Sequence, residues 1–473
     1  MLVPSRPFLA SFLLVASAAG QCATSWQPFG GPTGGVRALA ALPDGELVVA
    51  GDFLAVGGVA ATRVARWDGV QWHAMGAGLP WQVWALETLS DGSLAAGGMF
   101  GGLMRWNGAA WSQLGALQPY ALDLQALPGG GVAVAGSFPI PGGGNAALWT
   151  GAAWQPLGPL NGDSLAVCRL ADGSLVFGGS FSVAGGVAAS AVARWNGAQW
   201  QGLGGGMNDL VIALAAHPDG SVYAGGNFTQ AGGQPAAHVA RWNGAQWQPL
   251  GAGVDGSVLC LTVLPGGDVI VGGDFDNAGG QPAAGIARWN GVAWTTFGGI
   301  DGNGLVWDVL APQRGAAVVG GAFATAAGAS SPNLARLASA CPAGAVDLGG
   351  GCAAASAGAT RWPWLGGALE TAATGLPTFA FAVAVTGLAP ANVPLATLLP
   401  QGQPGCALLV TPDLLDAALA VGGTARVALP IPSQAALLGL TLRQQYVSFE
   451  LDANGRLTTV TATNALAATI GAF

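Results

Sequence analysis

Two carboxylates depart from an otherwise apolar position of the chain, and paired carboxylates are the groups that do acid–base chemistry on sugars. Asp123 and Asp308 stand in strand-like segments where other repeats carry small residues, and we expect both to face a central channel. A polysaccharide hydrolase or lyase could use them; the simpler interpretation is that each carboxylate binds water there. The equivalent residues elsewhere are Ala38, Ala85, Ala166, Ala213 and Cys260.

Aromatic side chains form a second group with possible function. Trp81 and Tyr120 lie in connections between repeats, where exposed rings suit stacking on a sugar or a peptide. Trp84 and Trp307 occupy a position that is Leu or Ile in other repeats, which favours packing in the core. The candidate ligand-binding residues are therefore Trp81, Tyr120, Trp84 and Asp123.

Metal and redox chemistry are disfavoured by the placement of the few possible ligands. His73, His217 and His238 fall in different parts of their repeats, so one centre would have to join different faces of the structure. Oxygens of Asp274, Asp276 and Asn277 could hold calcium, but this loop lacks a full ligand set and solvated acids are the preferred interpretation. No metal and no cofactor are predicted.

A repeated arginine could be mistaken for an anion site. Because it recurs around the whole array, we expect it to bond one repeat to the next instead, as a buried arginine must be paired. These arginines are Arg66, Arg105, Arg194, Arg241, Arg288 and Arg336.

A recurring hairpin positions these side chains, and its best copy is the segment RWNGAQW at 241–247. Asn-Gly suits the centre of a two-residue type I′ turn, so Trp242 would face Ala245 and Trp247 would face Ala240. Both indoles then share one face, which must pack on a neighbouring sheet because a lone hairpin is marginal in water. The structural repeat residues are Trp67, Trp72, Trp195, Trp200, Trp242, Trp247, Trp289 and Trp294.

Each hairpin follows a Gly-rich strand that ends in phenylalanine. Together with the alternating strand before it, each repeat reads as four short strands, which is typical of a β-propeller blade. The seven terminal phenylalanines are Phe53, Phe100, Phe138, Phe181, Phe228, Phe275 and Phe323. The sequence therefore predicts an all-β fold with a seven-bladed propeller.

The two ends of the array complement each other. The last repeat stops at Leu337 without a second Trp, and the missing half stands at the start, where residues 25–30 match 246–251. We expect Trp26 and its strand to complete the last blade and close the ring, which removes exposed sheet edges.

Loop lengths predict where the ring is notched. From the phenylalanine to the first hairpin position the interval is 14 residues in five repeats, but 6 from Phe100 to Trp106 and 11 from Phe138 to Trp149. The shortening falls in one loop of the second and third repeats. Such loops lie on one face of a propeller, so a notch there would be the place for a ligand.

The rest of the chain divides into a leader and a tail. Residues 1–20 contain Arg6, an apolar run over 8–15 and small residues that suit cleavage, as in a secretory signal peptide, and the run is too short to span a bilayer. Residues 21–340 hold the propeller. Residues 341–473 lack the hairpin motif but alternate like strands, which indicates a separate β-sandwich. We expect a secreted or cell-surface protein with no transmembrane segment after signal removal.

Composition supports a packed chain that does not bind nucleic acid. Despite 80 glycines, 51% of the 473 residues are hydrophobic and 18 are Trp, which favours a turn-rich all-β fold over disorder. The net charge is −8, and no basic stripe is visible, so non-specific nucleic-acid binding is disfavoured.

The six cysteines suit an oxidising compartment. Extending the closing strand pair places Ser339 opposite Cys22, so Cys22 and Cys341 could staple the ring. Cys168 and Cys260 are expected to be buried free thiols. The open alternatives are Cys22–Cys341 with Cys352–Cys406, or Cys341–Cys352 with Cys22–Cys406.

The paired glycines and aromatics resemble kelch-type propellers, although the Trp-Asn-Gly-x-x-Trp hairpin is shorter than the kelch segment. A closer likeness is to GGxF…WNGxxW repeats of secreted and cell-surface proteins, such as the propellers of fungal cortical polarity markers, over about 24–340. The tail resembles a C-terminal module of secreted bacterial proteins, through 405–410, 430–432, 437–445, 464–466 and 470–471. These resemblances imply fold and export but no ligand.

The expected function is that of a secreted or surface, non-catalytic binding scaffold, monomeric, with a glycan or protein ligand on the propeller. Two alternatives remain at this point: a hydrolase or lyase acting on polysaccharide, and a structural spacer whose tail serves for sorting or attachment.

Overall fold

The computed structural model describes residues 24–470 apart from short gaps, and it contains two compact units, one of residues 24–340 and one that includes 341–472. The proposed signal peptide lies outside the described residues. The gaps are 116–119, 138–143, 265–266, 302–303, 314–315, 340–343, 350–355, 362–366, 378–379, 402, 404–405, 421–422, 432–436, 438 and 453–455.

Within its described residues, the first unit forms seven four-stranded antiparallel sheets. In chain order the first three are β2 (Val36–Ala41), β3 (Leu47–Gly51), β6 (Val64–Trp67) and β7 (Trp72–Ala74); β8 (Val83–Thr88), β9 (Leu94–Gly98), β10 (Leu103–Trp106) and β11 (Trp111–Leu114); and β12 (Tyr120–Ala126), β13 (Val132–Ser137), β14 (Ala146–Trp149) and β15 (Trp154–Pro156).

The next three sheets repeat the same order of strands. They are β16 (Ser164–Arg169), β17 (Leu175–Gly179), β20 (Val192–Trp195) and β21 (Trp200–Gly202); β22 (Val211–Ala216), β23 (Val222–Gly226), β26 (Val239–Trp242) and β27 (Trp247–Pro249); and β28 (Ser257–Val263), β29 (Val269–Asp274), β32 (Ile286–Trp289) and β33 (Trp294–Thr296).

The last sheet joins the two ends of the unit. Its strands are β34 (Leu305–Gln313), β35 (Ala316–Ala322), β38 (Leu334–Ser339) and the N-terminal β1 (Thr24–Pro28). Trp26 pairs with Leu337, so the predicted closure by the N-terminal strand is confirmed. Because Ser339 lies opposite Thr24, the predicted register with Cys22 is wrong.

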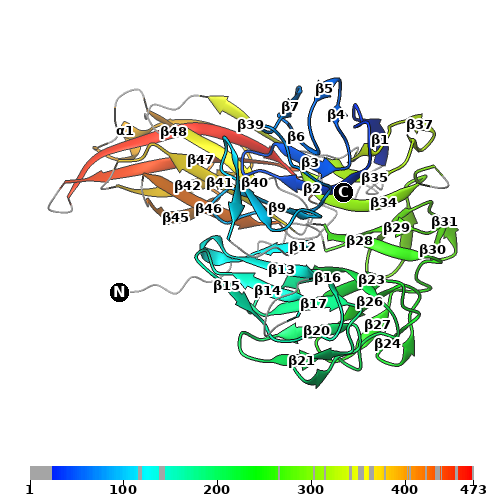
Figure 1. Ribbon diagram of the computed structural model, residues 1–473. Helices are drawn as coiled ribbons and strands as arrows, with labels where there is room; N and C mark the ends of the chain where they lie inside the picture. Colours follow the sequence, from blue (N-terminus) through cyan, green and yellow to red (C-terminus); the bar gives the residue numbers. More distant parts are fainter. Residues whose placement is uncertain are drawn as a thin grey trace. The chain divides into compact units, whose positions relative to one another are not determined.

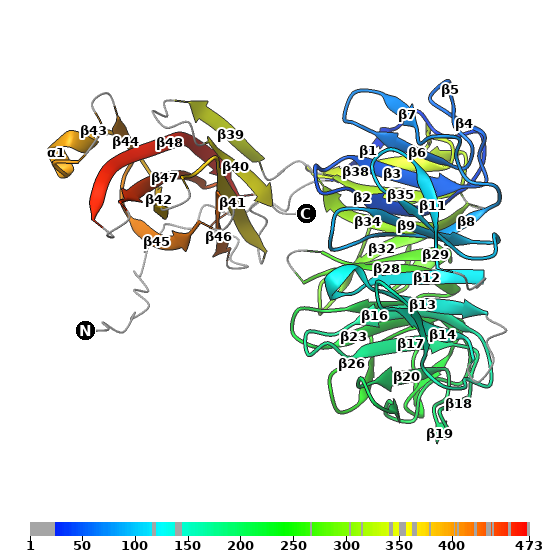
Figure 2. The same ribbon diagram turned by 60° about the vertical axis from the view of Figure 1, so that its left-hand side comes forward.

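First strands make the centre of the unit. Each contacts the first strand of the next sheet, and β34 contacts β2, so the sheets close into a ring (Figures 1 and 2). Ala, Val and Leu side chains pack between the sheets together with Phe and Trp rings. The second strands are buried along most of their length, and β3 along all of it. The unit is a β-propeller.

Short two-stranded hairpins follow the second strands of five sheets within the described residues. They are β4 (Ala55–Val56) with β5 (Val59–Ala60), β18 (Val183–Ala184) with β19 (Val187–Ala188), β24 (Gln230–Ala231) with β25 (Gln234–Pro235), β30 (Asn277–Ala278) with β31 (Gln281–Pro282), and β36 (Thr325–Ala326) with β37 (Ala329–Ser330). In the second sheet, residues 99–102 alone join β9 to β10. The loop of the third sheet that the sequence predicts to be short includes residues 138–143, which lie outside the described residues.

The Trp hairpin differs in register from the two-residue turn that the Asn-Gly pair predicts. Trp242 lies directly opposite Trp247, so four residues form the loop. The Oδ1 atom of Asn243 accepts the backbone N–H groups of Ala245 and Gln246, both at 2.9 Å. This side-chain cap satisfies the wider turn, and only Gly244 needs positive φ.

Paired indoles pack within and between sheets, as expected. Ring centroids of Trp242 and Trp247 are 5.5 Å apart. Trp247 Nε1 donates to the carbonyl oxygen of Leu203, at the end of the preceding sheet, at 2.9 Å. Trp111, Trp200 and Trp294 make the equivalent bond to Met75, Leu157 and Leu250 at 3.0, 2.7 and 2.8 Å.

The repeated arginines do not bond one sheet to the next, so that prediction is wrong. Arg241 of β26 pairs with Asp219 in the turn between β22 and β23 of its own sheet, at 2.6 Å. The third strand lies beside that turn, so the nearest acid belongs to the same repeat. Equivalent pairs are Arg66–Glu46, Arg105–Asp91, Arg194–Asp172 and Arg288–Asp268.

The second unit is also built from β-strands. A five-stranded sheet contains β39 (Gly344–Gly349), β48 (Leu457–Thr469), β47 (Thr441–Leu451), β42 (Ala380–Gly387) and β45 (Leu414–Leu419). A three-stranded sheet contains β40 (Ser356–Arg361), β41 (Ala368–Thr374) and β46 (Thr424–Pro430). A ribbon of β43 (Pro390–Pro394) and β44 (Ala407–Val410) flanks the short helix α1 (Leu395–Leu398).

Buried side chains join the two larger sheets of this unit. Ala357 and Ala373 of the three-stranded sheet share a core with Ala382 and Tyr446 of the five-stranded one. The Tyr446 hydroxyl donates to the carbonyl oxygen of Thr371 at 3.0 Å, which satisfies the one polar atom of this buried ring.

Cys168 and Cys260 are buried free thiols, as predicted. Cys406 is buried in the second unit. Cys22, Cys341 and Cys352 lie outside the described residues, so the pairing of these four cysteines stays a prediction. No helix in the described part of the chain is long and apolar enough to cross a membrane.

Candidate functional site

A β-bulge stands at the same place in all seven first strands of the propeller and exposes one residue to its centre. In β2 the ladder to β3 passes from Val36 to Ala38 and leaves Arg37 unpaired. Bulges commonly re-aim side chains in this way. The skipped residues are Arg37, Trp84, Leu122, Leu165, Ile212, Leu259 and Trp307.

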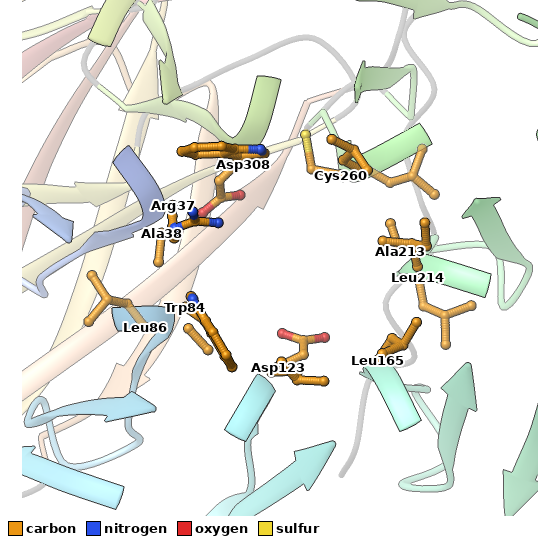
Figure 3. A pocket seen from close by; sticks show the side chains of 16 residues that line it. Arg37, Ala38, Trp84, Leu86, Asp123, Leu165, Ala213, Leu214, Cys260 and Asp308 are labelled. Atoms are coloured by element: carbon orange, nitrogen blue, oxygen red, sulfur yellow. The ribbon is translucent and has the colours of Figure 1, made fainter. Parts of the chain in front are cut away.

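Around these bulges lies a central cavity of about 170 Å³. All seven skipped residues line it, together with the residue that follows in most of the strands. Asp123 and Asp308 therefore reach the channel, as predicted, and Figure 3 shows the Asp123 carboxylate pointing inward between Trp84 and Leu165.

The cavity has two chemically different sides. Four consecutive strands, β34, β2, β8 and β12, contribute every charged or indole side chain of the lining: Trp307, Asp308, Arg37, Trp84 and Asp123. The other three strands, β16, β22 and β28, contribute Leu165, Ile212, Ala213, Leu214, Leu259, Cys260 and Leu261. A ligand with one hydrogen-bonding side and one apolar side matches this division.

Each of the two aspartates also joins its sheet to the next. Asp123 Oδ1 accepts the N–H of Leu124 at 2.8 Å, and its Oδ2 accepts the N–H of Val167 on β16 at 2.8 Å. Asp308 repeats this arrangement with Val309 at 2.8 Å and with Leu39 on β2 at 2.7 Å. These four bonds fix both carboxylates while leaving further lone pairs for water or a ligand.

Glu87 is a third carboxylate of this region that sequence reasoning missed. Its Oε1 atom accepts the N–H of Ala126 at 2.8 Å and the Nε2–H of Gln125 at 3.1 Å. Gln125 in turn accepts the N–H of Arg169 at 3.0 Å. Glu87 stands at the position where the first strand of the opening repeat has Ala40. This departure from the repeat is the sequence feature that could have identified Glu87 as a candidate site residue.

Burial makes all three carboxyls weak acids. Desolvation raises the pKa of Asp123 to about 7, against the opposing effect of its two N–H donors, and repulsion from Glu87 and Asp308 adds to the rise. Desolvation likewise raises the pKa of Glu87 to about 7 and that of Asp308 to about 6. Near neutral pH Asp123 and Glu87 are therefore poised between the acid and the carboxylate form, whereas Asp308 reaches this balance at a slightly lower pH.

Among the described residues, Arg37 is the one cation in the cavity lining, and sequence reasoning did not select it. Its Nε atom pairs with Asp52 at 3.1 Å, and its Cζ atom lies 4.1 Å from the centroid of the Trp307 ring. This stacking holds Trp307 at the cavity wall, so Trp307 and Trp84 are lining residues instead of the core residues that their sequence position favoured.

The predicted ligand-binding residues separate into two groups. Trp84 and Asp123 line the cavity, whereas Trp81 and Tyr120 do not belong to its lining. Exposure of Trp81 and Tyr120 is confirmed, because 62% and 49% of their surfaces are accessible. A binding role for these exposed rings stays a prediction.

The acidic loop considered for calcium has a structural role. Asp255 Oδ1 accepts the N–H groups of Asp276 and Asn277 at 2.9 and 2.8 Å, and its Oδ2 accepts from Asn277 Nδ2 at 2.6 Å. In the preceding repeat, Asn208 Oδ1 likewise accepts the backbone N–H groups of Thr229 and Gln230 at 3.0 and 2.9 Å. Among the described residues, no group of three or more His, Cys, Asp or Glu side chains could hold a metal ion.

Comparisons with known proteins agree on the fold. A family model described as a β-propeller domain of unknown function matches residues 42–67, 170–196 and 217–243, each a segment from a first-to-second strand turn to the end of a third strand. The match covers three repeats and carries no activity. No curated protein matches the chain.

Solved structures that resemble the chain are distant. The WD40 β-propeller domain of Doa1 is 17% identical, with 66% of this chain and 96% of that one covered and a TM-score of 0.47. Virginiamycin B lyase from Staphylococcus aureus is 8% identical, with 67% and 99% covered and a TM-score of 0.45. The extracellular domain of the putative hybrid two-component system BT4673 from B. thetaiotaomicron is 10% identical, with 95% and 59% covered and a TM-score of 0.45. With TM-scores below 0.5, these likenesses say nothing about the function of this chain.

Proposed function

We propose that this chain is a secreted or cell-surface, non-catalytic binding protein, a kelch-like seven-bladed propeller followed by a β-sandwich. Its central cavity takes the end of a neutral or basic glycan. The observation that carries this proposal is the two-sided lining, in which Asp123, Asp308, Trp84 and Trp307 face an apolar arc.

Departures from the repeat support a binding role over a packing role. Four of the other sheets place Leu or Ile where Trp84 and Trp307 stand, and the first sheet places Arg37 there. Where Asp123 and Asp308 stand the other sheets carry alanine or Cys260, so the ring can be built without these side chains. Indoles stack on the C–H face of a sugar ring, and carboxylates accept hydrogen bonds from its hydroxyl groups.

The charge and the volume of the central cavity limit the class of ligand that can bind there. Two lining carboxylates and nearby Glu87 stand against Arg37, which is already paired with Asp52. An anionic sugar would be repelled, and an amino sugar would be attracted. The volume of about 170 Å³ is smaller than a drug-sized pocket, so one terminal sugar unit is the expected occupant.

Binding to a glycan array tests this proposal, with repeat-matched substitutions in the full chain. Trp84→Leu and Asp123→Ala each install the residue type that other sheets carry at that position, so the fold should tolerate both. We expect each to weaken binding about tenfold or more, while Leu165→Ile, on the apolar arc, changes it less. An array without signal, or a signal indifferent to both substitutions, contradicts the proposal.

The exposed rings give the competing location of the site. If Trp81→Ala and Tyr120→Ala abolish glycan retention while Trp84→Leu does not, the ligand binds on the outer surface instead of in the cavity. A protein ligand would be recognised there without any glycan signal.

A hydrolase or lyase acting on polysaccharide is the second candidate, favoured by the raised pKa values of Asp123 and Asp308, which suit acid–base work near neutral pH. It requires turnover of a glycan that is lost in Asp123→Asn or Asp308→Asn. Binding without turnover excludes it. A structural spacer with a sorting or attachment tail predicts neither binding nor turnover, but release of a tail-deleted chain from the cell surface.

A further inference from the structure

A second cavity lies at the seam where the propeller closes, and it contains an arginine that the repeat elsewhere neutralises. The cavity has a volume of about 160 Å³ and lies between the first sheet and the closing sheet. Its lining includes Phe29, Trp67, Leu47, Val318 and Arg336.

Arg336 is the last of the repeated arginines and differs from the others in its partner. Five of them pair with an acid in the first turn of their own sheet. In the closing sheet this turn reads Ala311-Pro312-Gln313-Arg314-Gly315-Ala316 and holds no acid. Among the described residues Arg336 has no carboxylate partner, and its Cζ atom lies 5.5 Å from the centroid of the Phe29 ring.

Aromatic and aliphatic side chains surround this guanidinium. The rings of Phe29 and Trp67 meet edge to face with centroids 5.1 Å apart, and Leu47, Leu310 and Val318 complete the apolar wall. A dry cavity of about 150 Å³ is large enough to hold a benzene ring. The cavity therefore offers space for one ring beside one cation that has no carboxylate partner in the described part of the chain.

We propose that this seam binds a small apolar monocarboxylate of the size of one aromatic ring. Its carboxylate would pair with Arg336 and take the place of the acid that Glu46 or Asp268 supplies in other sheets. Its ring would pack on Phe29 and Trp67. This site is separate from the central cavity, so the proposal does not depend on whether the chain binds a glycan.

Calorimetric titration of the full chain with benzoate tests the site, with benzyl alcohol and acetate as matched ligands. We expect benzoate to bind, and both the uncharged alcohol and the ringless acid to bind at least about tenfold more weakly, since a charge-assisted pair and ring burial both contribute. Arg336→Met should weaken benzoate by a similar factor, and Arg241→Met, which removes a paired arginine elsewhere, should not.

A second variant covers the case in which Arg336→Met fails to fold. Ala316 is the residue of the closing sheet that is equivalent to Glu46 and Asp268. Each of these three residues comes directly before the residue that pairs with the first hairpin position. These pairs are Leu47 with Trp67, Val269 with Trp289 and Ala317 with Leu337. Ala316→Asp therefore supplies an internal carboxylate and should exclude benzoate while preserving the fold. Absence of benzoate binding to the native chain, equal binding by benzyl alcohol, or unchanged binding in Ala316→Asp overturns the proposal.

Discussion

The carboxylate of Asp308, on the innermost strand of the closing sheet, accepts the backbone N–H of Leu39 on the innermost strand of the first sheet at 2.7 Å. The two residues lie near opposite ends of the propeller sequence, in its first and last sheets. One side chain thus links the last sheet to the first at the wall of the central cavity, in the way that Asp123 links the third sheet to the fourth through Val167.

Replacing Asp308 should change how stability depends on pH. Its pKa is raised from 3.8 to about 6 in the folded chain, so between these values the unfolded chain loses a proton that the folded chain keeps. The stability that this carboxyl contributes is therefore complete below pH about 4 and declines as pH rises to about 6.

Chemical denaturation of the native chain and Asp308→Ala across this range measures the effect. The difference in free energy of unfolding should fall by ~1 kcal/mol from pH 4 to pH 6, after allowance for screening by cavity water. Acids with a lowered pKa, such as Asp172, are present in both the native chain and the variant, so their contributions cancel in this difference in free energy of unfolding. A difference that stays level or rises with pH would contradict the raised pKa.

Where the second Trp of a hairpin donates its N–H to the preceding sheet, it should contribute through this bond as well as through its ring. Trp247→Phe keeps an aromatic ring but leaves the carbonyl of Leu203 without its donor, and should cost about 1–2 kcal/mol. Trp154 is the matched control, because its buried Nε1 has no hydrogen-bond partner among the described residues. Trp154→Phe should cost about 1 kcal/mol less; equal costs in urea denaturation would show that the bond contributes nothing.

The cap in the hairpin loop should be measurable by itself. Asn243→Ala removes the acceptor of two backbone N–H groups, and we expect a loss of about 1 kcal/mol in the free energy of unfolding. Gln246→Ala, in the same exposed loop, should stay within about 0.5 kcal/mol of the native chain. The cap has no role if the two variants are equally stable.

Ring closure should depend on Trp26. Its Nε1 donates to the carbonyl oxygen of Phe297 at 2.6 Å, and its strand covers the edge of β38. Trp26→Ala should lower the free energy of unfolding by about 2–3 kcal/mol and promote association through the exposed edge, detected by sedimentation velocity. Trp81→Ala, which truncates an exposed ring, should do neither.

Repetition made much of the architecture predictable. Alternation, Gly-rich turns and the paired Trp residues act over a few neighbouring positions, so they specify four short strands each time they occur. The half-hairpin at Trp26 predicted the closing strand because its missing partner stood at the other end of the array. Asp123 and Asp308 were found as exceptions to an apolar position.

Register and partner choice needed the tertiary structure. Asn-Gly alone suits a two-residue turn, but the Asn243 side chain caps two N–H groups and stabilises a four-residue one. The repeated arginine, expected between sheets, lies beside the acid of its own turn, as in Arg241 with Asp219. Both outcomes depend on side-chain reach across strands, which residue spacing does not encode.

By itself, the sequence determined an all-β repeat, the closing strand and the positions that break the pattern. Only the tertiary structure decided that a bulge in every first strand turns Arg37, Trp84 and Trp307 toward one cavity, and that Glu87 stands near its acids. The physical reason is that the ring brings together residues separated by dozens to hundreds of positions, and their meeting depends on closure of the whole propeller.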